Sequence, residues 1–475
     1  MPVRWRKTGL ALVATVALWS ALLARAEEAP SQSTSDAQSA SDPLRERLDA
    51  LEKEVAVVRR QLEVKQEEDQ RDKDRTGVLT VDSQGFQLRS RDMKTYRLRL
   101  RGYVQSDGRV FLENDEGAND TFLIRRARPV LEGTLLDVVD FKLMPDFGGS
   151  GTSSSAQATL QDAYANFRPW SFLQLQSGKF KGPVGLERLQ SATNLSFIER
   201  ALPTQLVPNR DIGAQLWGDL REGLVQYQIA GMNGVIDGGS ADANSNDAFD
   251  VIGRIFVHPF QETSIEPLQG LGIGFAGSFG RQNTAKNTAT STPTAQYRTV
   301  GQQIFFSYGV GVEQIDEQVR LAPQAYWYWG PFGAMFEWVR SSPRLRLGGS
   351  EISPDIDSWQ ITAGYVLTGE ARTYQGVVPR SSFNPAREDT GAGAWELVAR
   401  VDELSIDKDV FDKGFANPAT TAQEAFEWGV GLNWYINPFL KLSVDYNDTR
   451  FNRGAPDGRN RGTEGVLGTR LQVAF

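Results

Sequence analysis

Cysteine is absent from this chain of 475 residues, and histidine occurs only once. Without thiols the chain can form neither a disulfide scaffold nor a thiolate metal site, and we expect no metal or other cofactor. No run of about 20 apolar residues follows the first 26 residues, so the sequence predicts no membrane-spanning helix. Two classes remain: a secreted β protein, or a transmembrane barrel whose alternating strands conceal their hydrophobicity.

An excess of positive charge is also lacking, because the formal net charge is −8 at pH 7. This balance argues against nucleic acid as a partner. It does not describe the interior of a pore, where local charge decides what enters.

Residues 1–26 have the features of a secretory signal peptide. Arg4, Arg6 and Lys7 precede an apolar run, and a small-x-small site ends at Ala26. The run is short for a membrane anchor, so we expect export and cleavage near Ala26.

Residues 27–42 are rich in serine and alanine and are interpreted as a disordered tether. A helix is predicted over 43–75. Its apolar residues alternate at spacings of four and three, which favours a short periplasmic coiled coil, although a lone amphipathic helix would show the same seam. These residues are Leu44, Leu48, Leu51, Val55, Val58 and Leu62.

From residue 78 to 475 the apolar period changes to two. Leu98 and Leu100 fall on one face of a strand, and Arg97 and Arg99 fall on the other. About sixteen such segments follow one another. The fold class is therefore all-β, a transmembrane antiparallel β-barrel of about 16 strands with a short N-terminal coiled-coil helix.

The predicted connections are asymmetric, as in outer-membrane barrels. Short turns are expected near 168–170, 330–332 and 437–439. Long loops are expected at 182–210, 233–247, 282–316, 343–356 and 451–462. One long connection, about 371–391, falls on the side of the short turns.

The end of the chain and its aromatic residues suit an outer membrane. Aromatic rings gather at strand ends around 326–329 and 434–439, where they would meet the lipid interface. The last strand alternates and stops on Phe475. A terminal phenylalanine of this kind resembles the signal read by the barrel assembly machinery. We therefore expect outer-membrane lipid and that machinery as partners.

Six segments carry a family resemblance: FLIRRAR at 122–128, GKFKGPVGLER at 178–188, RDIG at 210–213, YVLTGE at 365–370, GAWELVAR at 393–400 and NWY at 433–435. In their order and spacing the sequence resembles the phosphate-selective porin O and P family over about 96–475. The resemblance implies a homotrimer of sixteen-stranded barrels, each with the loop at about 182–210 folded into its lumen. The connection at 371–391 could be a further inward segment.

The resemblance also implies an anion site. In this sequence Arg125 and Arg126 match the family's paired arginines, and Asp162 matches its strand aspartate. Arg188 and Ser191 match the loop base and a loop serine, while Ala192 stands where a second serine would be expected.

The strand pattern adds a candidate path for small inorganic anions. Arg97, Arg99 and Arg101 share one face at intervals of two residues, and Arg126 shares a face with Arg128 on the next strand. On a regular strand Arg125 would point away from Arg126, so Arg126 is assigned to the lumen. The alternative is a wet wall that carries charges of both signs.

The sequence thus predicts passive diffusion of anions such as phosphate or polyphosphate, and not an enzyme. A glycine pattern at 272–277 is followed by no helix, and His258 has no catalytic partners in view. A general or cation-tolerant porin remains the alternative within transport. A secreted structural or adhesion protein remains the alternative from another class.

Overall fold

The computed structural model describes residues 42–75, 77–82, 85–92, 94–114, 117–149, 158–244, 247–388 and 390–475. The predicted signal peptide and all of the predicted tether except Asp42 lie outside these ranges. The chain divides into two units, residues 1–75 and 76–475. The first contains a helix, and the second contains the described strands.

Helix α1 (Asp42–Arg75) occupies the range predicted to be helical. From Leu48 to Leu62, the side chains of its predicted seam are exposed, with Leu48 at 55% and Leu62 at 53%. Their pairing in a coiled coil stays a prediction. None of the helices described in the structure is long and apolar enough to cross a membrane.

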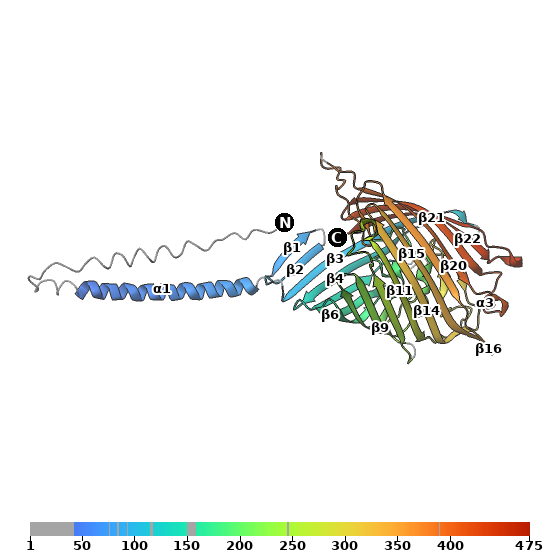
Figure 1. The fold of residues 1–475 in the computed structure, drawn as a ribbon, viewed down its shortest axis with the longest axis horizontal. Helices are drawn as coiled ribbons and strands as arrows, with labels where there is room; N and C mark the ends of the chain where they lie inside the picture. Colours follow the sequence, from blue (N-terminus) through green and yellow to red (C-terminus); the bar gives the residue numbers. More distant parts are fainter. Residues whose placement is uncertain are drawn as a thin grey trace, which may run out of the picture. The chain divides into compact units, whose positions relative to one another are not determined.

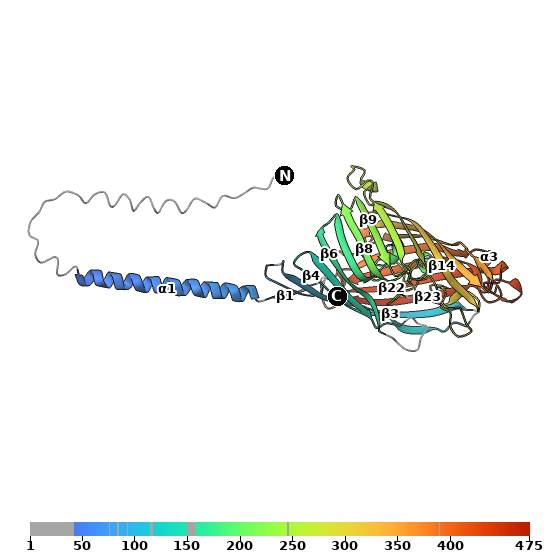
Figure 2. The ribbon, with the colours of Figure 1, turned by 90° about the horizontal axis from the view of Figure 1, so that it is seen from below.

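A closed antiparallel barrel of sixteen strands forms the second unit and confirms the predicted fold class (Figures 1 and 2). Consecutive strands pair with one another around the wall. In chain order they are β3 (Tyr96–Asn114), β4 (Thr121–Leu135), β5 (Val139–Asp146), β6 (Thr159–Trp170), β7 (Leu173–Phe180), β8 (Asp211–Leu220), β9 (Val225–Met232), β10 (Asp250–Val257), β11 (Leu271–Arg281), β14 (Val312–Trp329), β15 (Phe332–Leu347), β17 (Ile356–Val366), β20 (Ala394–Ile406), β21 (Ala422–Asn437), β22 (Leu440–Arg453) and β23 (Glu464–Ala474).

Alternation along each strand separates an outer apolar face from a polar lumen. On β3, the outward Val104 and Val110 are 41% and 39% exposed, whereas Gln105, Asp107 and Arg109 are at most 4% exposed. In a membrane, the outer face would lie against lipid. The inner face contacts loops that fold into the barrel.

Pairing of the last strand with the first closes the wall. Val473 on β23 lies opposite Val104 on β3. The terminal Phe475 exchanges two backbone hydrogen bonds with Gly102, at 2.8 and 2.9 Å. Next to this closure, the hairpin of β1 (Val78–Asp82) and β2 (Gly85–Arg89) pairs with the start of β3. Where β3 and β23 pair, the sheet therefore has no free edge.

The two ends of the barrel differ in their connections, as predicted. A tight turn joins β14 to β15, where Trp329 pairs with Phe332 and Gly330 adopts φ 53°, a conformation that suits glycine. The connection 367–393 lies at this same end although it is long. It contains β18 (Arg372–Thr373) and β19 (Gly376–Val377).

Long loops from the other end pack into the barrel and form a common apolar core. This core joins Leu202 and Leu206 of 181–210 to Phe306 of 282–311 and Phe411 of 407–421. The loop 407–421 was not among the predicted long loops, because polar residues interrupt the four apolar residues that are buried in it. The short elements in these loops are α2 (Leu186–Leu189), η1 (Leu202–Leu206), β12 (Gln296–Arg298), β13 (Ile304–Ser307), β16 (Ser350–Ile352) and α3 (Asp409–Asp412), with η2 (Glu266–Leu268) and η3 (Pro456–Gly458) in other connections.

Candidate functional site

The loop 181–210 lies inside the barrel and is hydrogen-bonded to the wall opposite its own strands. The backbone N–H of Leu186 donates to Glu337 on β15 at 2.6 Å. Leu202 donates to Asp402 on β20 at 3.0 Å, and Ile198 donates to Asp445 on β22 at 2.8 Å. Wall carboxylates thus satisfy loop amides that would otherwise be buried without partners.

One loop carboxylate, Glu199, sits among four arginines of the wall. Its oxygens lie 2.6 Å from Arg125, 2.9 Å from Arg109, 3.7 Å from Arg126 and 3.8 Å from Arg470. Burial alone would raise the pKa of Glu199, but these guanidinium groups lower that pKa well below its ordinary value. Glu199 therefore stays ionised and holds the loop against β3, β4 and β23.

Arg125 and Arg126 both reach the lumen, which corrects the assignment of Arg126 alone. The register between β3 and β4 shifts after the pair Gln105–Arg126, and the next pair is Ser106–Ile124. Arg125 is the extra residue of this β-bulge. A bulge turns a side chain out of strict alternation, so two neighbouring arginines contact the same carboxylate. Nothing in the sequence marks the position of such a bulge.

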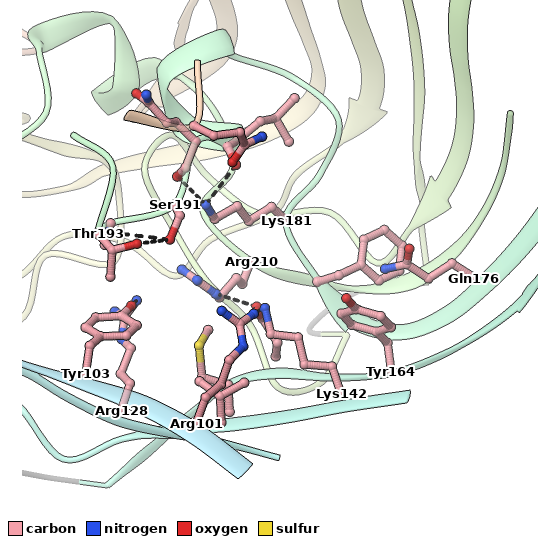
Figure 3. Close-up of a pocket in the computed structure, with 18 of the residues that line it drawn as sticks. Arg101, Tyr103, Arg128, Lys142, Tyr164, Gln176, Lys181, Ser191, Thr193 and Arg210 are labelled. Carbon is pink, nitrogen blue, oxygen red and sulfur yellow. Dashed lines mark hydrogen bonds and ion pairs between the residues drawn. The ribbon is translucent and has the colours of Figure 1, made fainter. Parts of the chain in front are cut away.

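A cavity of about 350 Å³ separates the loop from the wall formed by β3 to β9 (Figure 3). One carboxylate, Asp162, lines it. Five cationic side chains line it as well: Arg101, Arg128, Lys142, Lys181 and Arg210. Hydroxyl and amide groups of Tyr103, Tyr164, Gln176, Ser191 and Thr193 complete much of the polar lining.

Four of these five cations have carboxylate partners. Asp162 accepts from Lys142 at 2.8 Å and from Arg210 at 2.9 Å. Arg128 pairs with Asp146 at 2.8 Å, and Arg101 pairs with Glu132 at 2.9 Å. Shared carboxylates fix these cations and reduce, without cancelling, the positive charge of the cavity.

Lys181 differs, because no carboxylate of the described residues lies within ion-pair distance of it. Its ammonium group donates to the carbonyls of Leu189 and Gln190, at 3.3 and 2.8 Å. Figure 3 shows it beside Ser191 at the cavity. Burial, with the nearby Arg200 and Arg210, lowers the pKa of Lys181 well below its ordinary value. The negative charge of a bound anion would oppose both effects and raise the pKa of Lys181 again.

Arg188, the predicted loop base, does not line this cavity. Its guanidinium donates to the carbonyl of Thr204 and, at 3.3 Å, to the side chain of Asn209. The one-turn helix α2 directs Arg188 toward the loop's own backbone. The predicted loop serine, Ser191, is exposed at the cavity and hydrogen-bonds to Thr193 at 2.9 Å.

The three arginines predicted along β3 lie toward the end with short turns. Arg97 and Arg99 line a neighbouring cavity of about 240 Å³ together with Glu132, Asp140 and Lys142. Arg99 and Arg101 share Glu132, at 3.5 and 2.9 Å. This part of the path therefore carries charges of both signs.

Lys142 and Glu199 were among the functional candidates absent from the predicted site. Lys142 could have been found, because it shares the lumen parity of Asp140 on β5. Glu199 could not, because a loop has no periodicity that shows where its side chains point.

Comparison with known proteins agrees with this geometry. Residues 98–475 match the family model "Phosphate-selective porin O and P". The chain is 24% identical to Porin O of Pseudomonas aeruginosa over 431 residues, which is 82% of this chain and 91% of that protein. The fold is similar to the outer-membrane channel DcaP of Acinetobacter baumannii, with a TM-score of 0.52 at 11% identity over 82% of this chain and 99% of that one.

The family match extends across the whole barrel, from the first wall strand to the terminal phenylalanine. It sets aside the alternative of a secreted structural or adhesion protein. A wall that is apolar outside and polar inside, narrowed by an inward loop, is what such a match would require. This chain belongs to the phosphate-selective porin O and P family and is an outer-membrane porin.

Proposed function

We propose that this porin passes small inorganic anions, phosphate among them, by passive diffusion, without a catalytic step. The cavity between the loop and the wall carries the proposal, because five cations and one carboxylate line it. The chain as a whole is acidic, with a net charge of −8. The positive lining is therefore a local feature and not a consequence of composition.

The partners of the cations support transit more than tight capture. An anion crossing a pore must exchange water for donors and then leave again. The paired cations Arg101 and Arg128 offer guanidinium donors weakened by carboxylates, whereas the ammonium form of Lys181 has only carbonyl partners. We propose that protonated Lys181 is the strongest single attraction at the constriction, the cavity between the loop and the wall, with Ser191 and Thr193 as neutral donors beside it.

Planar-bilayer recording tests the role of Lys181. A unit charge that meets an anion at about 4 Å contributes about 1 kcal/mol even at the dielectric constant of water. This energy is about fivefold in partitioning. We expect Lys181→Gln to lower the anion-to-cation permeability ratio severalfold in a potassium chloride gradient. The control is Lys413→Gln, which removes the same charge from an exposed side chain outside the cavity.

Equal reversal potentials in both variants would contradict the assignment of Lys181. A wild-type ratio near one would favour the general or cation-tolerant porin, for which Glu132, Asp146 and Asp162 provide the negative charges. Titration with phosphate during the same recording tests the narrower preference. We expect phosphate to reduce the chloride current at lower concentration in the wild type than in Lys181→Gln.

Assembly is part of the same proposal. We propose that the chain is exported through a signal peptide cleaved near Ala26, assembles in the outer membrane through Phe475, and forms a homotrimer. The exposed ring of Phe475 at the end of β23 supports the second step.

N-terminal sequencing of protein from outer membranes should begin at Glu27. Removal of Phe475 should lower its recovery there, and the mass of the detergent-extracted protein should equal three chains.

A further inference from the structure

A third cavity, of about 420 Å³, lies beside the constriction on the side of the short turns. The loop contributes Leu186, and the connection 367–393 contributes Tyr374 and Gln375. Tyr374 and Gln375 line the constriction cavity too, so the two cavities are neighbours. The lumen faces of β9, β10 and β14 complete the wall.

Aromatic rings dominate this recess. Tyr326 stacks on Tyr374 with ring centroids 5.4 Å apart, and it also contacts Phe256 at 5.0 Å and Tyr328 at 5.1 Å. His258 fixes Tyr326 through a hydrogen bond of 2.7 Å to its hydroxyl. Tyr374 is fixed by its hydroxyl, which donates to the carbonyl of Leu186 at 2.6 Å. The rings therefore form a held surface and not a set of free side chains.

Arg254 is the cation of the recess, and no carboxylate in the described ranges lies within ion-pair distance of it. Its guanidinium donates to the amide oxygens of Gln324 and Gln228, at 3.3 and 3.2 Å. It lies 4.8 Å from the ring centroid of Phe256. Arginine has five N–H donors, so several remain for a ligand. A sheltered cation without a counter-charge is unusual in proteins.

We propose that this recess binds organic anions that combine a planar ring with a carboxylate. The carboxylate would pair with Arg254, for which the planar guanidinium is suited, and the ring would pack against Tyr328 and its neighbours. Inorganic phosphate has no apolar surface with which to cover the rings. A neutral sugar could cover them but would leave Arg254 without its counter-charge. Both features are satisfied together by a ring-bearing carboxylate.

This inference rests on the proposed anion channel and names a second class of solute for it. Because the recess adjoins the constriction, a bound ring would obstruct the path. Benzoate should therefore interrupt the chloride current through the wild-type protein at concentrations where acetate, which lacks a ring, does not. Benzyl alcohol, which has the ring but no charge, should interrupt it more weakly than benzoate.

Two substitutions test the recess itself. Arg254→Gln should weaken the benzoate block roughly tenfold, since it removes a charge-assisted pair. Tyr328→Leu should weaken it severalfold and leave the response to acetate unchanged. Arg387→Gln is the matched control, because it removes the same charge from an exposed position of the connection 367–393. Variants that insert with wild-type unit conductance are folded well enough for comparison.

The outcomes separate this inference from the anion channel. A clear chloride preference with equal block by benzoate and acetate would overturn the recess and leave the channel intact. Block by benzoate that persists unchanged in Arg254→Gln, or that benzyl alcohol equals, would overturn the role of Arg254. Benzoate block in a protein without chloride preference would retain the recess and refute the channel's anion selectivity.

Discussion

Glu199 should act as an electrostatic latch between the inward loop and the wall. It contacts Arg109, Arg125, Arg126 and Arg470, all within 3.8 Å. Among the residues that the structure describes, Asp107 is the one other carboxylate within ion-pair distance of these arginines, 2.7 Å from Arg470 and 3.9 Å from Arg109. Glu199→Gln keeps the size and one acceptor of the side chain and removes its charge.

Two consequences follow from that single change. Removing one partner of a buried ion pair lowers the free energy of unfolding by about 3–5 kcal/mol, because the charge of the remaining partner stays buried without compensation. The retained amide oxygen places the expected loss of unfolding free energy near the lower end, about 3 kcal/mol. The lumen also gains one net positive charge. At about 1 kcal/mol for a charge at contact, the anion preference should rise by at most about fivefold.

Both consequences can be measured on one preparation. Urea unfolding reports the stability, and bilayer recording reports the permeability ratio together with current noise from a loosened loop. Glu351→Gln is the control, because it removes a carboxylate whose pair with Arg344 is about 40% exposed on both sides. Exposed pairs contribute at most about 1 kcal/mol. If Glu199→Gln matches Glu351→Gln in stability and in permeability ratio, Glu199 is not a latch.

Two further predictions concern pH and the N-terminal helix. Because the pKa of Lys181 is lowered, its positive charge is lost at a lower pH than that of an ordinary lysine. Chloride preference should therefore fall as the pH rises through that lowered pKa. Reversal potentials should show this decline in the wild type and not in Lys181→Gln. A peptide of residues 43–72 should be helical by circular dichroism and should self-associate in sedimentation equilibrium, since single short helices are marginal in water. A monomeric random coil at high concentration would contradict the coiled coil.

The barrel could be predicted from the sequence because its wall obeys one rule throughout. Strict alternation separated Leu100 from the arginines of its strand and assigned Arg126 and Arg128 to the lumen, and the structure agrees. The rule is strong because a shift of one residue would turn every apolar side chain into the pore. It also located the long connection on the short-turn side, near 371–391.

The site was less predictable because its specific features depend on departures from that rule. The bulge at Arg125 changes the direction of a side chain without any mark in the sequence. The orientation of Arg188 depends on how the loop packs after it has entered the barrel. Glu199 is defined by partners on three strands that are distant in sequence, and such contacts have no local signature.

The distribution of counter-charges varies along the proposed anion path. Most cations of the constriction share carboxylates, so an anion meets them as moderate sites. Lys181 and Arg254 are the exceptions, and the cavities they line both include Tyr374 and Gln375. An anion leaving Lys181 can therefore approach Arg254 past that shared segment. Such an exchange would let Lys181 pass its anion to a second cation instead of directly into water, which permits attraction without a trap.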